Sequence, residues 1–199
     1  MRAAFGDAAV GRYRGSVSAE PGYDELGAVI LSEDELRRRI VALGAEITTD
    51  YAGRAPLLVG VLKGAFVFMA DLARAITLPV EIDFMAVSSY GSATRTSGVV
   101  RIVKDLDLDL AGRDVILVED IIDSGLTIAY LRKMLSARGA ASFEVCALMV
   151  REATLRVDVS SLKYIGFRIP DEWVVGYGLD AGQRWRNLPD IRIWRGRHE

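Results

Sequence analysis

The sequence predicts an α/β fold with a largely parallel sheet flanked by helices. Two observations predict it: apolar runs of strand length recur between residues 56 and 150, and stretches of helix length separate them. Such alternation is typical of a parallel sheet that helices cover on both faces. The chain has 199 residues, of which 51% are hydrophobic and 26% are charged. This composition allows a sizeable core in one domain and excludes a disordered or collagen-like chain.

The chain begins with a segment that carries no regular pattern. Residues 1–23 mix four glycines, one proline, small residues and charges of both signs, so we predict a flexible extension. The first predicted helix starts after Ser32, which is a good N-cap, and Glu35 completes a capping box. Its apolar positions are spaced four, three and four residues apart, as on one face of an amphipathic helix: Leu36, Ile40, Leu43 and Ile47.

The alternating elements follow after Gly53. We predict strands over residues 56–62, 80–87, 99–103, 115–118 and 143–150, and helices over residues 64–76 and 127–138. The chain past Asp158 is β-like, rich in turns, and contains all three tryptophans. We therefore expect residues 24–199 to form a single domain, in which segments of about 24–35 and 159–199 build a small hood over one end of the sheet. Ligands of such sheets bind outside the carboxyl ends of the strands.

Charge and cysteine content limit the partner and the compartment. Lys and Arg together number 25 and Asp and Glu 27, giving a net charge of −2, so we expect no nucleic-acid partner. Cys146 is the single cysteine, and one thiol forms no internal disulfide, which favours a reducing cytosol. No apolar run is long enough to span a membrane, and the first residues lack a signal-peptide core. The sequence thus predicts a soluble cytoplasmic protein without a membrane partner.

The most informative stretch follows the strand at 115–118. Two adjacent carboxylates, Glu119 and Asp120, are followed by Asp123 and then by the turn Ser124-Gly125-Leu126-Thr127. The turn offers backbone N–H groups, hydroxyls and a helix N-terminus, which together suit a phosphate group, although by itself it is also an ordinary N-cap. The vicinal acids suit either a diol or a hydrated Mg²⁺, and Asp123 suits proton transfer. Clustered carboxylates at the end of a buried strand indicate a functional site.

This stretch resembles the phosphoribosyl pyrophosphate signature of the type I phosphoribosyltransferases, and Asp123 resembles the hypoxanthine-guanine branch in particular. The resemblance extends over about residues 24–193. It implies the type I phosphoribosyltransferase fold and purine salvage, in which the 5-phosphoribosyl group of phosphoribosyl pyrophosphate is transferred to hypoxanthine or guanine. The products would be IMP or GMP and pyrophosphate. The resemblance also implies Mg²⁺ as cofactor and a homodimer or homotetramer.

The resemblance assigns a role to each matching residue. Asp123 would be the general base, and Ser89 and Tyr90 would belong to a mobile lid. The first loop would carry a cis peptide bond between Lys63 and Gly64, with its backbone facing the pyrophosphate. The implied substrate-binding residues are Lys63, Gly64, Glu119, Asp120, Ser124, Gly125, Leu126, Thr127, Arg151, Trp173, Val174 and Arg186. The implied metal ligands are Glu119, Asp120 and Asp180.

One departure from the family affects base recognition. The family usually has a lysine whose ammonium contacts the 6-oxo group of the purine, and this chain has Arg151. Arginine also donates hydrogen bonds, but its planar fork is larger, so the exchange is not conservative. The preference between hypoxanthine and guanine, or a preference for xanthine, therefore stays open. A non-catalytic regulator that senses phosphoribosyl pyrophosphate and binds nucleic acid is a second alternative, against which Asp123, Ser89, Tyr90 and the net charge argue.

Overall fold

The computed structural model describes residues 22–89, 100–159 and 162–196. The elements lie in the order β1 (Leu26–Leu31), α1 (Glu33–Asp50), β2 (Leu57–Leu62), α2 (Phe66–Ala75), β3 (Glu81–Ser89), β4 (Val100–Lys104), β5 (Asp114–Ile122), α3 (Leu126–Ser136), β6 (Ser142–Arg151), β7 (Tyr164–Ile169), β8 (Val174–Val175) and β9 (Ile191–Trp194). Two 3₁₀ turns, η1 (Tyr23–Glu25) and η2 (Glu152–Thr154), precede β1 and follow β6.

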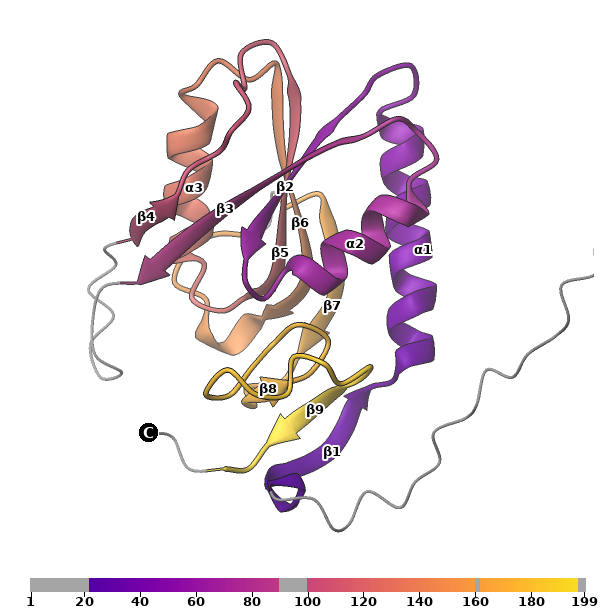
Figure 1. Ribbon diagram of the computed structural model, residues 1–199, viewed down its shortest axis with the longest axis vertical. Helices are drawn as coiled ribbons and strands as arrows, with labels where there is room; N and C mark the ends of the chain where they lie inside the picture. Colours follow the sequence, from indigo (N-terminus) through magenta and orange to yellow (C-terminus); the bar gives the residue numbers. More distant parts are fainter. Residues whose placement is uncertain (1–21, 90–99, 160–161, 197–199) are drawn as a thin grey trace, which may run out of the picture.

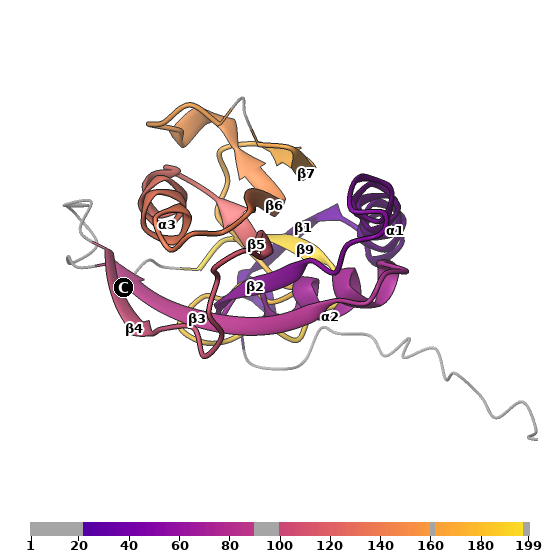
Figure 2. The ribbon, with the colours of Figure 1, turned by 90° about the horizontal axis from the view of Figure 1, so that it is seen from above.

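The large sheet has six strands in the order β4-β3-β2-β5-β6-β7. Neighbouring strands pair in parallel except β3 and β4, which are antiparallel. Helices α1 and α2 pack in the hydrophobic cluster on one face and α3 in the cluster on the other (Figures 1 and 2). The predicted α/β fold with a largely parallel, helix-flanked sheet is confirmed. Among the described helices, none combines the length and the apolar character that crossing a membrane requires.

Helix α1 begins where the capping signal predicts. The Ser32 hydroxyl accepts a hydrogen bond from the Glu35 backbone N–H at 3.4 Å, and the Glu35 carboxylate accepts one from the Ser32 backbone N–H at 2.9 Å. The predicted apolar face is buried in full: Leu36, Ile40, Leu43 and Ile47. Gly44 lies on this face, and a Cβ there would come within 2.6 Å of Ala75 Cβ. The absence of a side chain at Gly44 therefore permits the close approach of α1 to the end of α2.

Strand β5 is longer than the sequence predicts. It runs from Asp114 to Ile122 rather than over 115–118, so both vicinal acids lie within the strand and not after it. Pairing with β6 continues to the pairs Glu119–Ala147 and Ile122–Val150, which explains the extension. Backbone hydrogen bonds to a neighbouring strand thus keep polar residues in the extended conformation where their side chains alone indicate a strand end.

A second, three-stranded sheet has the order β1-β9-β8 and joins the two ends of the described chain. It lies beside the carboxyl ends of the parallel strands (Figure 1). The predicted hood boundaries are too wide, because β7 falls within 159–199 and yet pairs in parallel with β6 in the large sheet. Tyr164 of β7 is fully buried in the hydrophobic cluster that covers one face of the large sheet. The hood therefore consists of η1, β1, the residues 170–173 that lead into β8, β8, β9 and the turns between them.

The predicted extension over residues 1–23 is tested only at its end. Residues 1–21 lie outside the described part of the chain. Tyr23 belongs to η1, and its ring packs edge-on against Trp185 with 5.0 Å between the ring centroids. Trp185 in turn lies with Trp194 and Val175 in a small hydrophobic cluster. Tyr23 is therefore part of the hood rather than of an extension.

Candidate active site

The register between β5 and β6 brings the first two site residues together. Because Ile122 is opposite Val150, the next residues along the two strands, Asp123 and Arg151, are neighbours. Arg151 Nη1 lies 3.3 Å from Asp123 Oδ1, and Arg151 Nη2 donates a hydrogen bond to the Glu172 carbonyl oxygen at 2.8 Å. Arg151 is only 7% exposed. A buried guanidinium is thus held between a carboxylate of the large sheet and a carbonyl group of the hood.

A cavity of about 200 Å³ opens beside this pair. Its walls come from the end of β5, the end of β6 and the segment around β8: Asp120, Ile121, Asp123, Arg151, Trp173, Val174, Leu179 and Asp180. Six of these eight residues are ones that the sequence marks as site residues. Trp173 is 48% exposed, and Val174 is buried in the small sheet. The cavity therefore combines an exposed aromatic ring, a buried cation and three carboxylates.

The vicinal acids have different surroundings. Neighbouring side chains on a strand face opposite sides, so Glu119 continues the row that contains Leu117 and Asp120 the row that contains Val118. Asp120 lines the cavity and Glu119 does not. Burial raises the pKa of Glu119 well above its ordinary value, and the charge of Asp120 raises it further. Burial also raises the pKa of Asp120 to about 6, against the lowering effect of backbone hydrogen bonds and of the Arg186 charge.

The loop between β2 and α2 packs directly on Asp120. A cis peptide bond is present, but it joins Leu62 to Lys63, so the expected position between Lys63 and Gly64 is wrong by one residue. A Cβ at Gly64 would overlap Oδ2 of Asp120, and a Cβ at Gly178 would overlap the Gly64 carbonyl oxygen. Only glycine at Gly64 and Gly178 allows the backbone of this loop to lie between the acid and the hood.

A network of polar contacts links this loop to the C-terminal segment. Arg186 Nη2 lies 2.6 Å from Asp180 Oδ1, and Arg186 Nη1 donates a hydrogen bond to the Gly178 carbonyl oxygen at 2.7 Å. The Gln183 side-chain oxygen accepts hydrogen bonds at 3.2 Å from both Lys63 Nζ and Arg186 Nη2. Gln183 thus joins the two cations that the sequence assigns to pyrophosphate. Gln183 belongs to no motif, and its only signal in the sequence is its spacing of three residues from Asp180 and from Arg186.

The three acids assigned to a metal do not form a common cluster. Within the described residues, no three His, Cys, Asp or Glu side chains are grouped so that they could hold an ion. Glu119, Asp120 and Asp180 as ligands of an ion that the substrate carries therefore stay a prediction. The alternating sides of β5 separate Glu119 from Asp120, and Asp180 is paired with Arg186.

The turn after Asp123 opens α3 as the sequence suggests. Gly125 is the N-cap with a positive φ of 77°, and α3 starts at Leu126, one residue before the predicted start. The Leu126 backbone N–H donates to Ser124 Oγ at 3.4 Å. Ser124, Gly125, Leu126 and Thr127 lie next to Asp123 in sequence but do not line the 200 Å³ cavity.

The lid residues are described only in part. Ser89 is the last residue of β3 and pairs with Val100 of β4. Its side chain and the whole of Tyr90 lie outside what the structure describes.

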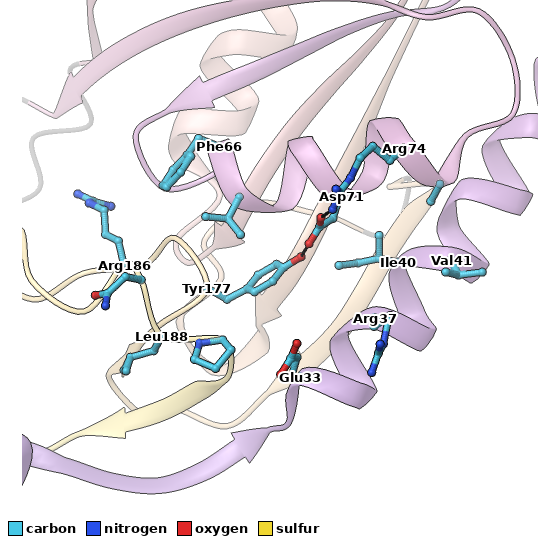
Figure 3. Close-up of a pocket in the computed structure, with 14 residues that line it drawn as sticks. Glu33, Arg37, Ile40, Val41, Phe66, Asp71, Arg74, Tyr177, Arg186 and Leu188 are labelled. Carbon is cyan, nitrogen blue, oxygen red and sulfur yellow. Dashed lines mark hydrogen bonds and ion pairs between the residues drawn. The ribbon is translucent and has the colours of Figure 1, made fainter. Parts of the chain in front are cut away.

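A larger cavity of about 640 Å³ lies between α1, α2 and the C-terminal segment (Figure 3). Among the site residues indicated by the sequence, only Arg186 lines it. Tyr177 points from the C-terminal segment toward α2, where its hydroxyl donates a hydrogen bond to Asp71 (Figure 3). Val41 and Phe66 on its wall are 58% and 44% exposed. The chemistry of the lining, and not the volume, thus identifies the smaller cavity as the candidate active site.

Comparison with known proteins decides the family. The family model described as "Phosphoribosyl transferase domain" matches residues 30–181. The chain belongs to the phosphoribosyltransferase family. The matched range includes β5, the turn that opens α3, and every wall of the small cavity.

Two bacterial proteins illustrate the curated relatives of this phosphoribosyltransferase. The chain is 46% identical over 169 residues to the hypoxanthine-guanine phosphoribosyltransferase of Bacillus subtilis, covering 85% of this chain and 93% of the relative. It is 49% identical over 174 residues to the bifunctional protein TilS/HprT of Listeria monocytogenes, covering 87% of this chain. The match spans only 27% of the length of that bifunctional relative.

A solved structure agrees with the fold. The crystal structure of a hypoxanthine-guanine phosphoribosyltransferase from Bacillus anthracis superimposes with a TM-score of 0.81 at 41% identity, covering 85% of this chain and 99% of that chain. The architecture of this phosphoribosyltransferase is therefore the type I phosphoribosyltransferase fold. The family resemblance of its sequence is confirmed.

The raised pKa of Asp120 predicts how the stability of this phosphoribosyltransferase depends on pH. Below pH 4 the carboxyl group is protonated in both the folded and the unfolded chain, so its raised pKa does not change the free energy of unfolding. Between pH 4 and 6 the unfolded chain loses this proton first, and above pH 6 the folded chain carries the full cost of a buried charge. Asp120→Asn removes that cost, so it should raise the free energy of unfolding by about 1–3 kcal/mol at pH 8.

Urea unfolding of metal-free protein at pH 8 and pH 4.5 measures this difference. The stabilisation should be largely lost at pH 4.5. Asp24→Asn at an exposed position is the matched control and should change the free energy by less than about 0.5 kcal/mol at either pH. Equal effects of Asp120→Asn at the two pH values would contradict the assigned ionisation.

Proposed function

We propose that this chain transfers the 5-phosphoribosyl group from phosphoribosyl pyrophosphate to hypoxanthine or guanine and releases IMP or GMP and pyrophosphate. The observation that carries the proposal is the 200 Å³ cavity, in which Asp123, Arg151 and Trp173 come together at the carboxyl ends of two parallel strands. A flat heterocycle with an oxo group and an acidic N–H needs an aromatic surface, a cationic donor and a base. The names of the Bacillus relatives agree with this reaction.

The purine would lie in the cavity against Trp173, whose ring is half-exposed and offers a stacking surface. The backbone of Val174 would read the edge of the base, and Arg151 would donate to its 6-oxo group. Nε of Arg151 is buried, makes no hydrogen bond to the described residues and lies 4.0 Å from Oδ1 of Asp171, so the protein does not use every donor of this guanidinium. Asp123 would accept the proton from N7 as N9 attacks C1 of the ribose.

The sugar and its phosphates would bind to the residues around this cavity. Glu119 and Asp120 would bind the ribose hydroxyls, and the turn of residues 124–127 would bind the 5′-phosphate at the start of α3. Lys63, the Gly64 backbone and Arg186 would neutralise the leaving pyrophosphate as the bond from C1 to oxygen breaks. The lid with Ser89 and Tyr90 would exclude water from the cationic sugar.

The residues present suit Mg²⁺ carried by the pyrophosphate. Their donors are carboxylate oxygens, and Mg²⁺ commonly binds one or two carboxylates together with substrate phosphates rather than an all-protein cage. Asp120 and Asp180 line the same cavity. Burial and the charge of Asp180 both raise the pKa of Asp120, and a bound cation would offset this cost of ionisation. We propose these two acids as its protein contacts. When bound, Mg²⁺ would supply charge neutralisation to the leaving group.

Release of pyrophosphate with each purine in turn tests the function. Hypoxanthine and guanine should give turnover in the presence of Mg²⁺, and excess chelator should abolish it. Asp123→Asn should retain nucleotide binding but lower kcat by about 10²–10⁴-fold, the usual contribution of a positioned general base. Turnover with xanthine alone would replace the proposed substrates, and absence of turnover with every purine would refute the function.

Arg151 allows a test of base recognition. Arg151→Lys keeps a cationic donor, so it should retain activity with a larger change in KM for the base than in kcat. Arg151→Ala should cost about 1.5–3 kcal/mol in kcat/KM for hypoxanthine, the value of a hydrogen bond to a charged group. The KM for phosphoribosyl pyrophosphate should stay close to normal in both variants. Unchanged kcat/KM for hypoxanthine and guanine in Arg151→Ala would remove Arg151 from base recognition.

We further propose that the protein is a cytoplasmic homodimer or homotetramer. The single thiol, Cys146, is buried and free, which suits a reducing compartment. The exposed apolar side chains of Val41 and Phe66 beside the 640 Å³ cavity are of the kind that subunit contacts cover. Light scattering coupled to gel filtration should give two or four times the 21.8 kDa of the chain. A monomeric mass at micromolar concentration would contradict the assembly.

A further inference from the structure

Thr154 touches the proposed general base although no motif contains it. The 3₁₀ turn η2 follows β6 directly and carries Thr154 back toward the end of β5. The Thr154 hydroxyl donates a hydrogen bond to Oδ1 of Asp123 and lies 3.2 Å from the Arg151 carbonyl oxygen. Thr154 thus bridges the base and the strand that carries Arg151.

Both donors to Asp123 meet the same carboxylate oxygen. Arg151 Nη1 lies 3.3 Å from Oδ1, the oxygen that also accepts the Thr154 hydroxyl. Oδ2 has no hydrogen bond or ion pair with any described residue, and Asp123 lines the 200 Å³ cavity. A carboxylate held through one oxygen by two donors from different directions loses its rotation about the last side-chain bond. The second oxygen is left to accept a proton.

The contact matters because Asp123 has little other support. Its side chain is 51% exposed, so packing does not hold it. Arg151, in contrast, is buried and anchored on the Glu172 carbonyl oxygen. A small displacement of a reacting group is costly to a reaction that depends on alignment. The hydroxyl of Thr154 supplies the second fixed point for the carboxylate.

We propose that Thr154 is a positioning residue for the general base Asp123, together with Arg151. This inference rests on the proposed function. The competing explanation is purely structural, with the hydroxyl closing the 3₁₀ turn through the Arg151 carbonyl group. The two explanations differ in one respect: positioning requires the Asp123 carboxylate, and turn closure does not.

A double-mutant cycle separates them. Thr154→Val keeps the shape and removes the hydroxyl, Thr154→Ser keeps the hydroxyl, and Thr154→Val is repeated in an Asp123→Ala background. Thr154→Val should lower kcat with hypoxanthine by about 10-fold, the effect of one hydrogen bond to a charged group. Thr154→Ser should stay within about twofold of the parent, and the KM for phosphoribosyl pyrophosphate should not change. In the Asp123→Ala background Thr154→Val should cause no further loss.

Thr49→Val is the matched control. Thr49 is exposed on α1, and its hydroxyl likewise donates to a backbone carbonyl group, that of Ala45 at 3.0 Å. It should leave kcat unchanged, and thermal unfolding of each variant reports on folding. Equal losses from Thr154→Val with and without the Asp123 carboxylate, or a Thr154→Ser variant as poor as Thr154→Val, would overturn the inference.

Failure of the inference and failure of the function have different signatures. An active parent that loses turnover in Asp123→Ala but not in Thr154→Val would keep the proposed function and reject the role of Thr154. A parent that releases no pyrophosphate with any purine would reject both.

Discussion

Parallel pairing of β5 with β6 determines where the reacting groups lie, because it aligns the residues that leave the two strands at the same edge. The pairing extends to Ile122 and Val150. Asp123 and Arg151 directly follow this pair, so they lie next to each other. The same pairing keeps Glu119 and Asp120 in the extended conformation, which sends their side chains to opposite sides. β2 pairs on the other flank of β5 and delivers the loop of Lys63 and Gly64 to the side of Asp120. One set of backbone hydrogen bonds thus arranges Asp123, Arg151, the vicinal acids and the loop that we propose to bind pyrophosphate.

Electrostatics at this edge favours ligand binding over stability of the protein alone. Burial raises the pKa values of Glu119 and Asp120, which means that their ionised forms are costly until a cation or hydroxyl group approaches. The cations, in contrast, have protein partners: Arg186 pairs with Asp180, and Lys63 donates to Gln183. A phosphate group that binds there must compete with a carboxylate and an amide. Exchange of charged partners, rather than burial of a bare charge, therefore accompanies binding of the pyrophosphate in the proposed reaction.

The hood adds what the parallel sheet cannot supply. Trp173, Val174 and Asp180 come from the C-terminal segment, and β1 from the other end of the described chain holds that segment through β9. The hood is thus a wall of the 200 Å³ cavity. It also supports the buried guanidinium of Arg151, which donates a hydrogen bond to the Glu172 carbonyl oxygen. Aromatic packing of Tyr23, Trp185 and Trp194 gives this small sheet its own hydrophobic cluster. In the proposed reaction, recognition of the purine depends mainly on the hood, and the chemistry at the sugar depends on the parallel sheet.

Features that depend only on neighbouring residues along the chain could be predicted from the sequence. The capping box at Ser32, the buried face of α1, the apolar strands and the acid-rich turn before α3 were all readable, since caps and periodicity act over a few residues. Tertiary structure alone decided the extension of β5 through its acids, the place of β7 in the large sheet, and the position of the cis bond before Lys63. It also decided the contact of Asp123 with Arg151. The same holds for two hydrogen bonds: Thr154 to Asp123 joins residues 31 positions apart, and Lys63 to Gln183 joins residues 120 positions apart. Such contacts follow from strand register and from the path of distant turns, and no local pattern of residue types encodes either.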